Sequence, residues 1–238
     1  MTDQQLLILS IIKEIDKICI KNNICYSLAY GSVLGAVRHK GFIPWDSDID
    51  IVIPLTSVEL FRSCIRKELP SNMRLLEWEK EKNYNPCFDR VVIVGQEQAI
   101  THVDIFTLCG VPDEDKQRRK FINSCYFTYH FFCNKFKDPK YSRVRNRWKV
   151  RLLKLMLSVV PSKTIKKKYK KMLYRYDFEH HDYVSTLVNP YKSKDYMIKR
   201  NLLDTIRKPF EDTELPIPKA YDEYLSHIYG DYMTPRKY

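Results

Sequence analysis

Long apolar stretches are missing from this sequence of 238 residues. A helix that crosses a bilayer needs roughly 18 to 20 consecutive apolar residues, and no segment reaches that length. The N-terminal segment carries Asp3, Glu14 and Asp16 and lacks the basic start and apolar run of a secretory signal. The sequence therefore predicts a protein that is made and kept in the cytoplasm.

Paired cysteines and glycine-rich tracts are also missing. The seven cysteines are odd in number and none of them forms a C-x-x-C pair, which argues against a disulfide framework and against a zinc knuckle. Only six glycines are present, and no low-complexity tract or internal repeat stands out. These absences favour an ordinary globular chain, long enough to bury a sizeable core.

The net charge of +12 is concentrated in one part of the chain. Residues 134–175 contain sixteen of the 41 basic residues and one of the 29 acidic residues. The rest of the chain has a slight acidic excess. The basicity is therefore a property of this segment, called the basic segment below, and not of the whole fold.

Hydrophobic periodicity divides the chain into an α/β half and a helical half. In residues 1–112 we expect helices at 2–22 and 57–68, one or two helical turns at 32–38, and strands at 24–30, 48–53, 73–77, 90–94 and 101–108. In residues 113–238 we expect helices at 113–123, 145–160, 164–174 and 219–229. This predicts an α/β protein in which 1–112 form the catalytic core, a mixed sheet with flanking helices. The helical region 113–238 carries the basic segment and a C-terminal tail that packs back on the core.

Asp48 and Asp50 lie on an expected strand, separated by one isoleucine. Alternation along a strand places both carboxylates on one face, close enough to share a divalent ion. Asp104, on another expected strand, is the natural third ligand. Aspartate is depleted in strands, and two like charges on one face repel each other unless a cation intervenes. We therefore expect Asp48, Asp50 and Asp104 to be catalytic and to bind one or two Mg²⁺ ions, with Mn²⁺ as an expected substitute.

Gly31-Ser32 follows a short strand and opens a helical turn. Glycine permits close backbone approach, and the serine hydroxyl and the helix N-terminus offer donors to a phosphate. A Gly-Ser pair is usually only a turn. Followed by an Asp-x-Asp strand, it is typical of the nucleotidyltransferase fold, so we expect that fold and a phosphate at Gly31 and Ser32.

The run Leu28–Ile51 closely resembles the LicD family, which includes phosphocholine transferases and is similar to the fukutin-related ribitol-phosphate transferases. The resemblance continues at His102–Phe106, Pro209–Glu211 and Pro216–Met233 and covers the basic segment poorly. It implies Mg²⁺-dependent transfer of a substituted phosphate from a CDP-linked donor to a sugar hydroxyl of a glycan, which in such families is often carried on a lipid. Whether the substituent is choline, glycerol or ribitol stays open at this point.

Further residues near the motif are expected to support the site. Arg38 and Arg90 are candidates for binding the donor diphosphate, since guanidinium groups bind phosphate bidentately. His39 and Asp46 lie in the loop before the Asp-x-Asp strand, and Asp46 is expected to support the metal ligands. Trp45 is expected to pack into the core and shape this loop, and Glu211 is a candidate substrate contact.

The basic segment admits two interpretations. Expected helices with apolar residues from Trp148 to Val160 and lysines from Lys163 to Lys171 are typical of a protein that binds an anionic membrane surface. The other interpretation is a core helix with a solvated face, followed by an exposed basic helix. We favour the first, which predicts peripheral association with the inner face of the cell membrane. Two alternatives to the phosphotransferase remain: a nucleotidyltransferase that moves a nucleoside monophosphate from a triphosphate, and a nucleic-acid-binding protein. No nucleic-acid-binding motif accompanies the charge, so we expect no nucleic-acid partner.

Overall fold

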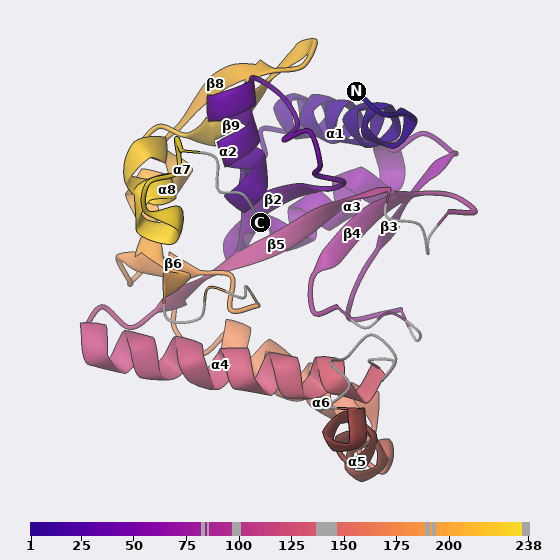
Figure 1. The fold of residues 1–238 in the computed structure, drawn as a ribbon, viewed down its shortest axis with the longest axis vertical. Helices are drawn as coiled ribbons and strands as arrows, with labels where there is room; N and C mark the ends of the chain where they lie inside the picture. Colours follow the sequence, from indigo (N-terminus) through magenta and orange to yellow (C-terminus); the bar gives the residue numbers. More distant parts are fainter. Residues whose placement is uncertain are drawn as a thin grey trace.

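A mixed sheet forms the centre of the computed structural model, which describes residues 1–81, 84, 86–96, 101–136, 147–188, 191 and 194–234 (Figure 1). The strands of this sheet are β1 (Ser27–Leu28), β2 (Ile49–Pro54), β3 (Met73–Leu76), β4 (Asp89–Ile93), β5 (His102–Val111), β6 (Tyr183–Ser185) and β7 (Met197–Ile198). A second sheet consists of β8 (Thr205–Phe210) and β9 (Thr213–Pro218). The mixed α/β class expected from the sequence is confirmed.

Strand β5 is central, because the order along the main path of the sheet is β1-β2-β5-β4-β3. Strands β2 and β5 run parallel, and β4 lies antiparallel to β5 on its other side. The second half of β5 pairs with β6, which in turn pairs with β7. Because of this arrangement, a residue in the first half of β5 has direct neighbours on both β2 and β4.

Helices cover the sheet and form a separate layer below it in Figure 1. The helices are α1 (Asp3–Lys21), α2 (Tyr30–His39), α3 (Val58–Glu68) after the short 3-10 helix η1 (Leu55–Ser57), α4 (Asp115–Phe136), α5 (Arg147–Ser158), α6 (Ser162–Leu173), α7 (Lys199–Leu203) and α8 (Tyr221–Tyr229). Helix α1 contacts β4, β5 and α3, whereas α2 contacts β2, β8 and α8. Helices α4 and α6 contact each other, and so do α4 and α5.

Helix α1 begins at a capping box formed by Thr2 and Gln5. The backbone N–H of Gln5 donates to the Thr2 hydroxyl at 3.2 Å, and the Thr2 N–H donates to the Gln5 side chain at 3.0 Å. These two bonds satisfy N–H groups that the helix leaves without partners. The same Gln5 side chain donates to the Asp46 carbonyl at 3.0 Å, so the start of α1 also anchors the loop before β2.

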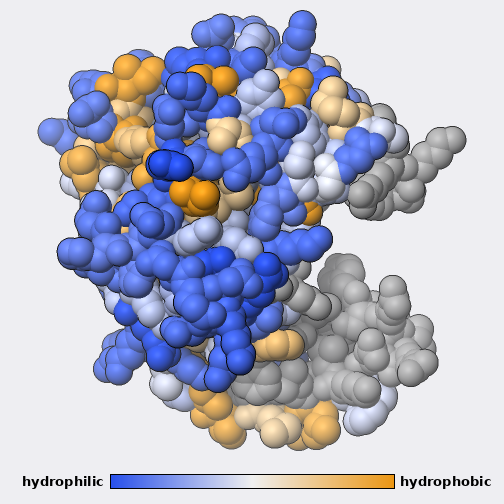
Figure 2. All heavy atoms as spheres, turned by 90° about the vertical axis from the view of Figure 1, so that its left-hand side faces the viewer, coloured by the Kyte–Doolittle hydropathy of each residue, from blue (hydrophilic) through white to orange (hydrophobic). Residues whose placement is uncertain are grey.

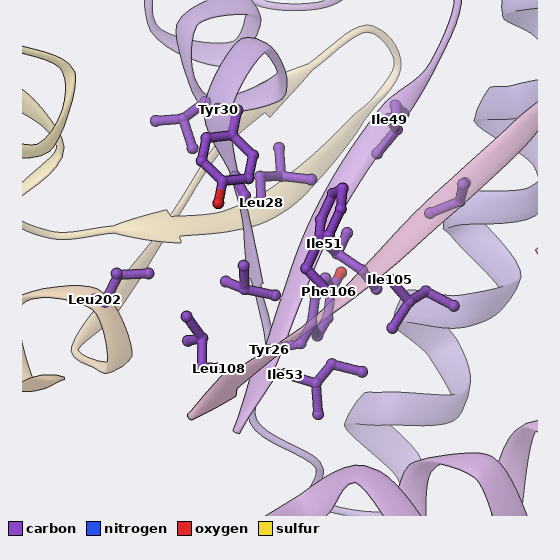
Figure 3. Close-up of a cluster of buried hydrophobic side chains, with 14 of the residues drawn as sticks. Tyr26, Leu28, Tyr30, Ile49, Ile51, Ile53, Ile105, Phe106, Leu108 and Leu202 are labelled. Atoms are coloured by element: carbon purple, nitrogen blue, oxygen red, sulfur yellow. The ribbon is translucent and has the colours of Figure 1, made fainter. Parts of the chain in front are cut away.

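The core under the sheet is built from aliphatic residues of β2 and β5 (Figure 3). Ile49, Ile51 and Ile53 are fully buried, as the alternation in β2 predicts. Figure 3 shows Ile51 and Ile53 on the side of the two strands that carries Ile105 of β5, the partner of Ile51. Burying one such side chain contributes about 1.5–3 kcal/mol, so β2 is firmly held and the acidic residues at its start are positioned by its packing.

The C-terminal segment folds back on the first two helices. Arg207 of β8 donates to both carboxylate oxygens of Asp16 in α1, at 3.1 and 2.7 Å. The Tyr224 hydroxyl of α8 accepts a hydrogen bond from the Tyr30 N–H, at the first residue of α2, at 3.0 Å. Residues almost two hundred positions apart therefore meet at the start of α2, where the phosphate motif lies.

The region after residue 112 contains strands that the sequence pattern did not predict. Strands β6 and β7 extend the central sheet, and β8 and β9 form a hairpin. The expectation of a helical C-terminal region therefore holds for α4 to α6 and α8 and is wrong for 183–185, 197–198, 205–210 and 213–218. Helix α4 also extends to Phe136, well past the expected end at 123.

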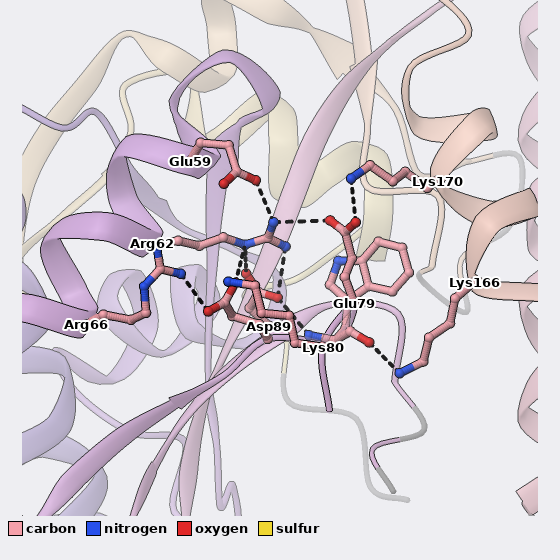
Figure 4. Close-up of polar contacts among 10 residues, drawn as sticks. Glu59, Arg62, Arg66, Glu79, Lys80, Asp89, Lys166 and Lys170 are labelled. Atoms are coloured by element: carbon pink, nitrogen blue, oxygen red, sulfur yellow. Dashed lines mark hydrogen bonds and ion pairs between the residues drawn. The ribbon is translucent and has the colours of Figure 1, made fainter. Parts of the chain in front are cut away.

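Part of the basic segment is tied to the sheet. The Lys166 ammonium is buried and donates to the Trp78 carbonyl, and to the Glu81 carbonyl at 2.8 Å. The Lys170 ammonium pairs with Glu79 at 2.5 Å (Figure 4). These two lysines hold α6 against the connection after β3, and Lys166, being buried, is not part of an exposed basic surface. Residues 137–146 of the basic segment lie outside the described residues.

Within the part of the chain that the structure describes, no helix is long and apolar enough to cross a membrane.

Candidate active site

Three charged side chains form a row across neighbouring strands. Asp50 of β2 is directly paired with Asp104 of β5, and Asp104 is paired on its other side with Arg90 of β4. Residues paired in this way project from the same face of a sheet. The sequence-predicted Asp50, Asp104 and Arg90 are therefore brought together by the order β2-β5-β4.

Asp48 completes the group from the end of the loop before β2. One carboxylate oxygen of Asp48, one of Asp104 and a ring nitrogen of His102 all lie within 4.8 Å of one another. Asp48 keeps partial exposure, whereas His102 and Asp104 are buried. The carboxylate cluster, meaning Asp46, Asp48, Asp50 and Asp104, thus has a buried end at Asp104 and an open end at Asp48.

Electrostatic repulsion inside the carboxylate cluster is large. Burial raises the pKa of Asp50 well above its ordinary value, and the charges of Asp48, Asp104 and Asp46 raise it further. Burial and the neighbouring Asp48 raise the pKa of Asp46 to about 6. Burial also raises the pKa of Asp104, although the Arg90 guanidinium counteracts part of this effect. Such a group of carboxylates is stable in its charged form when a cation is bound among them.

The donor set fits a magnesium ion. Mg²⁺ prefers oxygen ligands, chiefly carboxylates and phosphate oxygens. The carboxylates of Asp48 and Asp104 lie within 4.8 Å of each other, and Asp50 is paired with Asp104 across β2 and β5. The pKa values of Asp46 and Asp50 are raised first by burial and then by neighbouring carboxylates, Asp48 above all. The imidazole of His102 lies nearby, and imidazole is a ligand that suits other divalent metal ions as well.

Asp104 is held by two charge-assisted hydrogen bonds. The Arg90 Nε donates to one carboxylate oxygen at 2.5 Å and Nη2 donates to the other at 3.0 Å. Arg90 therefore occupies both oxygens of an expected metal ligand. These two bonds fix the orientation of the Asp104 carboxylate.

Gly31 and Ser32 lie beside the cluster, as the sequence predicts. The Ser32 hydroxyl accepts a hydrogen bond from the Asp50 N–H at 2.9 Å, so it fixes the start of β2 against α2. A Cβ added to Gly31 would lie 3.0 Å from a carboxylate oxygen of Asp46. A larger residue at 31 would press on the cluster, which explains glycine at this position.

Arg38, His39 and Trp45 lie on the open side of the site. Arg38 donates to the Tyr232 carbonyl at 2.8 Å and to the His39 ring at 3.0 Å. Partial burial, and secondarily the charge of Arg38, lower the pKa of His39. Trp45 is 67% exposed, so the expectation that it packs into the core is wrong. The buried residues of this loop are Phe42 and Ile43, and Trp45 instead lines a surface pocket with Arg38.

Glu211 holds the loop before β2 in place by hydrogen bonds. Its carboxylate accepts a hydrogen bond from the Phe42 N–H at 2.9 Å, and its own N–H donates to the Lys40 carbonyl at 2.8 Å. A Cβ at Gly41 would lie 2.1 Å from this carboxylate, so the loop approaches Glu211 as closely as glycine permits. Glu211 thus contacts this loop. Its expected contact with a substrate stays a prediction.

His102 was not singled out by sequence reasoning as a functional residue. Its Nε2 lies 3.6 Å from a carboxylate oxygen of Asp104. The signal was present, because His102 precedes Asp104 by two residues on a strand and so shares its face. It lacked weight because a lone histidine on a buried strand is more often a core residue than a ligand.

Comparison with known proteins places this chain in a family. Residues 23–159 match the model of the LicD/FKTN/FKRP nucleotidyltransferase domain, and the chain belongs to that family. It is 27% identical over 248 aligned positions to the lipopolysaccharide cholinephosphotransferase LicD of Haemophilus influenzae, an alignment that covers 97% of this chain and 90% of that protein. It is also 28% identical to an uncharacterized protein of Rickettsia typhi, over 50% of this chain and 32% of that protein.

Among solved structures, the chain is similar to ANT(2")-Ia in complex with adenylyl-2"-tobramycin. The identity is 12% and the TM-score is 0.31, over 68% of this chain and 96% of that one.

Proposed function

We propose that this LicD-family transferase moves phosphocholine from a CDP-linked donor to a sugar hydroxyl of a cell-surface glycan or its lipid-linked precursor. The observation that carries the proposal is the row of Asp50, Asp104 and Arg90 with Asp48 at its open end. It is supported by the similarity along almost the whole chain to a lipopolysaccharide cholinephosphotransferase. Glycerol phosphate and ribitol phosphate are the alternative groups for transfer.

The proposed roles follow from the positions of the side chains. Asp48 and Asp50 hold Mg²⁺, which when bound neutralises the donor diphosphate and stabilises the leaving oxygen. Asp104, the buried member of the cluster, orients the acceptor hydroxyl and accepts its proton. Arg38 and Arg90 bind phosphate oxygens from either side of the cluster. Gly31 and Ser32 keep α2 close to the start of β2, so that the phosphate can approach the carboxylates.

The bond that breaks distinguishes this function from that of a nucleotidyltransferase. Transfer of phosphocholine from CDP-choline releases CMP, whereas transfer of a nucleoside monophosphate from a triphosphate releases diphosphate. We expect CMP release that depends on the acceptor and on Mg²⁺, with phosphocholine gained by the acceptor. The measurement is chromatography of the nucleotides with mass spectrometry of the glycan, using CDP-choline, CDP-glycerol, CDP-ribitol and nucleoside triphosphates as donors. Nucleotide attached to the acceptor would contradict the proposal.

We also propose that α5 docks on an anionic lipid surface. Four large apolar side chains on this helix, Trp148, Leu152, Leu155 and Met156, are between 51% and 69% exposed, and Val159, directly after its end, is 81% exposed. Their spacing is that of one helix face. Arg151 and Lys154 are exposed beside them, and on α6 Lys163, Lys167, Lys168 and Lys171 are exposed, as is Lys170, which pairs with Glu79. Figure 2 shows hydrophobic residues gathered at the lower edge of the molecule, where Figure 1 places α5.

An apolar helix face bordered by cations is typical of a peripheral membrane contact. Replacing Leu152, Leu155 and Val159 together by serine is expected to abolish sedimentation with vesicles that contain anionic lipid. Replacing Lys163, Lys167, Lys168 and Lys171 by glutamine should weaken the binding to these vesicles and reduce the sensitivity of binding to salt. Each lysine near such a surface contributes about 1 kcal/mol.

The matched control exchanges four exposed lysines elsewhere for glutamine: Lys17, Lys67, Lys116 and Lys120. This control should sediment like the parent. Equal binding of the parent to neutral vesicles would contradict the electrostatic part of the proposal. A parent that binds no vesicles would contradict the proposal as a whole and favour a protein partner for this face.

A further inference from the structure

The surface pocket beside the carboxylate cluster has an unusual lining. It has a volume of about 160 Å³ and is lined by Gly31, Leu34, Arg38, Ile43, Trp45, Tyr229, Asp231, Tyr232 and Thr234. Three of these residues are aromatic and one is a carboxylate. These four residues come from the loop before β2 and from the end of α8 with the segment after it. The N-terminal and C-terminal parts of the chain therefore build the pocket together.

The pocket lies next to the place where the donor diphosphate is proposed to bind. A second crevice, too narrow in this structure to hold a water molecule, shares Gly31 and Ile43 with the pocket and is also lined by Ser32, Asp46 and Asp48. Gly31 and Ile43 therefore border both the pocket and the carboxylate cluster, so a phosphate at the cluster and a group attached to it in the pocket are neighbours. Arg38 lies on the pocket wall, where its guanidinium suits the phosphate end of such a ligand.

The tyrosine side chains of the pocket have their hydroxyl groups engaged elsewhere. The Tyr232 hydroxyl donates to Asp222 at 2.5 Å, and the Tyr229 hydroxyl accepts from Tyr191 at 3.1 Å. What these two residues offer a ligand is chiefly ring surface, to which Trp45 adds an exposed indole. Aromatic rings with a nearby carboxylate bind quaternary ammonium groups, whereas a polyol needs hydrogen-bonding side chains.

On the basis of the proposed function, we infer that the pocket of Trp45, Tyr229, Tyr232 and Asp231 binds the trimethylammonium head group of the phosphocholine that is transferred. Phosphocholine carries one positive and one negative group, and the pocket offers a partner for each. Its cation lies at the rings and Asp231, and its phosphate lies toward Arg38 and the crevice. The pocket thereby selects choline over glycerol or ribitol, which carry no positive charge.

The test is the binding of phosphocholine, sn-glycerol 3-phosphate and CMP, measured by calorimetry on the full chain with Mg²⁺. Trp45→Ala is expected to weaken phosphocholine binding about tenfold, the order of one partly desolvated cation–π contact. Asp231→Asn should weaken it several-fold. Neither variant should change the binding of glycerol phosphate or CMP by more than about twofold. Phe127→Ala removes an exposed ring from α4 and serves as the control, with no change expected for any ligand.

Turnover separates failure of this inference from failure of the proposed function. Trp45→Ala should raise the KM for CDP-choline and leave that for CDP-glycerol unchanged, provided that the parent uses both. If the parent transfers phosphocholine and Trp45→Ala binds phosphocholine as the parent does, the pocket assignment is wrong and the proposed function stands. Loss of CMP binding in Trp45→Ala would instead assign the pocket to the cytosine ring and overturn the inference. A parent that transfers no phosphocholine would overturn both.

Discussion

Asp50→Asn is expected to lower kcat by about a thousandfold or more, the equivalent of roughly 4 kcal/mol of transition-state stabilisation. The substitution keeps the shape of the side chain and removes one negative charge from the group that holds Mg²⁺. Asp48→Asn should have an effect of the same order. Asp104→Asn should also abolish turnover, yet retain binding of the donor if its main role is to accept the proton of the acceptor hydroxyl.

The Asp50→Asn substitution should not unfold the protein. The pKa of Asp50 is raised on folding, so the folded chain binds this proton more tightly than the unfolded chain does. At any pH above the ordinary value of 3.8, the charged carboxylate therefore costs stability, and a neutral amide relieves that cost. In the absence of metal, the Tm of Asp50→Asn should equal or exceed that of the parent.

Thermal denaturation with increasing Mg²⁺ links the two results. Magnesium should raise the Tm of the parent by mass action and have a smaller effect on Asp50→Asn. Asp204→Asn is the control, because Asp204 makes an exposed ion pair with Lys219 away from the row of β2, β5 and β4. Turnover of Asp50→Asn within a few-fold of the parent would show that the carboxylate cluster is not the active site.

Local patterns were sufficient to predict the carboxylates. Alternation in β2 places its isoleucines in the core and leaves Asp50 for the other face, and the same rule groups His102 with Asp104. What alternation cannot give is which strands are neighbours and in which register. Arg90 was expected to bind a phosphate, and its pairing with Asp104 depends on the antiparallel register of β4 and β5. That register arises from contacts between residues far apart in the sequence.

The hairpin β8–β9 was not predicted because its sequence contains Pro209, Pro216 and Pro218. Proline lacks the N–H that a central strand needs and so argues against a strand. In the described structure this sheet has two strands, so each strand has one edge on which a missing N–H costs nothing. The sequence alone does not reveal that both strands are edges.

Burial of individual long side chains was the other unpredictable feature. Lys166 lies in a run of lysines typical of a solvated face, yet its ammonium binds two carbonyl groups near the end of β3. Trp45 is apolar and was expected in the core, yet Phe42 and Ile43 fill that place. Both outcomes depend on which helix or loop packs opposite, and hydropathy along the chain does not contain that information.

Arg62→Met is expected to destabilise the protein more than any exposed charge substitution. The Arg62 guanidinium is buried and donates to both oxygens of the buried Asp89, at 2.6 and 3.1 Å, while its Nη1 donates to Glu59 and Glu79 (Figure 4). Removing one partner of a buried pair leaves an uncompensated charge and costs about 3–5 kcal/mol. For a chain of this size, the Tm should fall by roughly 10 °C.

A double-mutant cycle separates this charge effect from lost packing. Asp89 also accepts a hydrogen bond from the Trp78 N–H at 3.0 Å, which an asparagine side chain can keep. Arg62→Met with Asp89→Asn should therefore recover a large part of the stability lost in Arg62→Met. Arg119→Met, which breaks an exposed pair with Asp115, is the control and should cost less than about 1 kcal/mol.

Because Asp89 precedes Arg90 on β4, the network also fixes the strand that holds Arg90 against Asp104. Urea denaturation of the four proteins of the cycle supplies the numbers, and a loss for Arg62→Met no larger than that of Arg119→Met would contradict the role assigned to the buried pair.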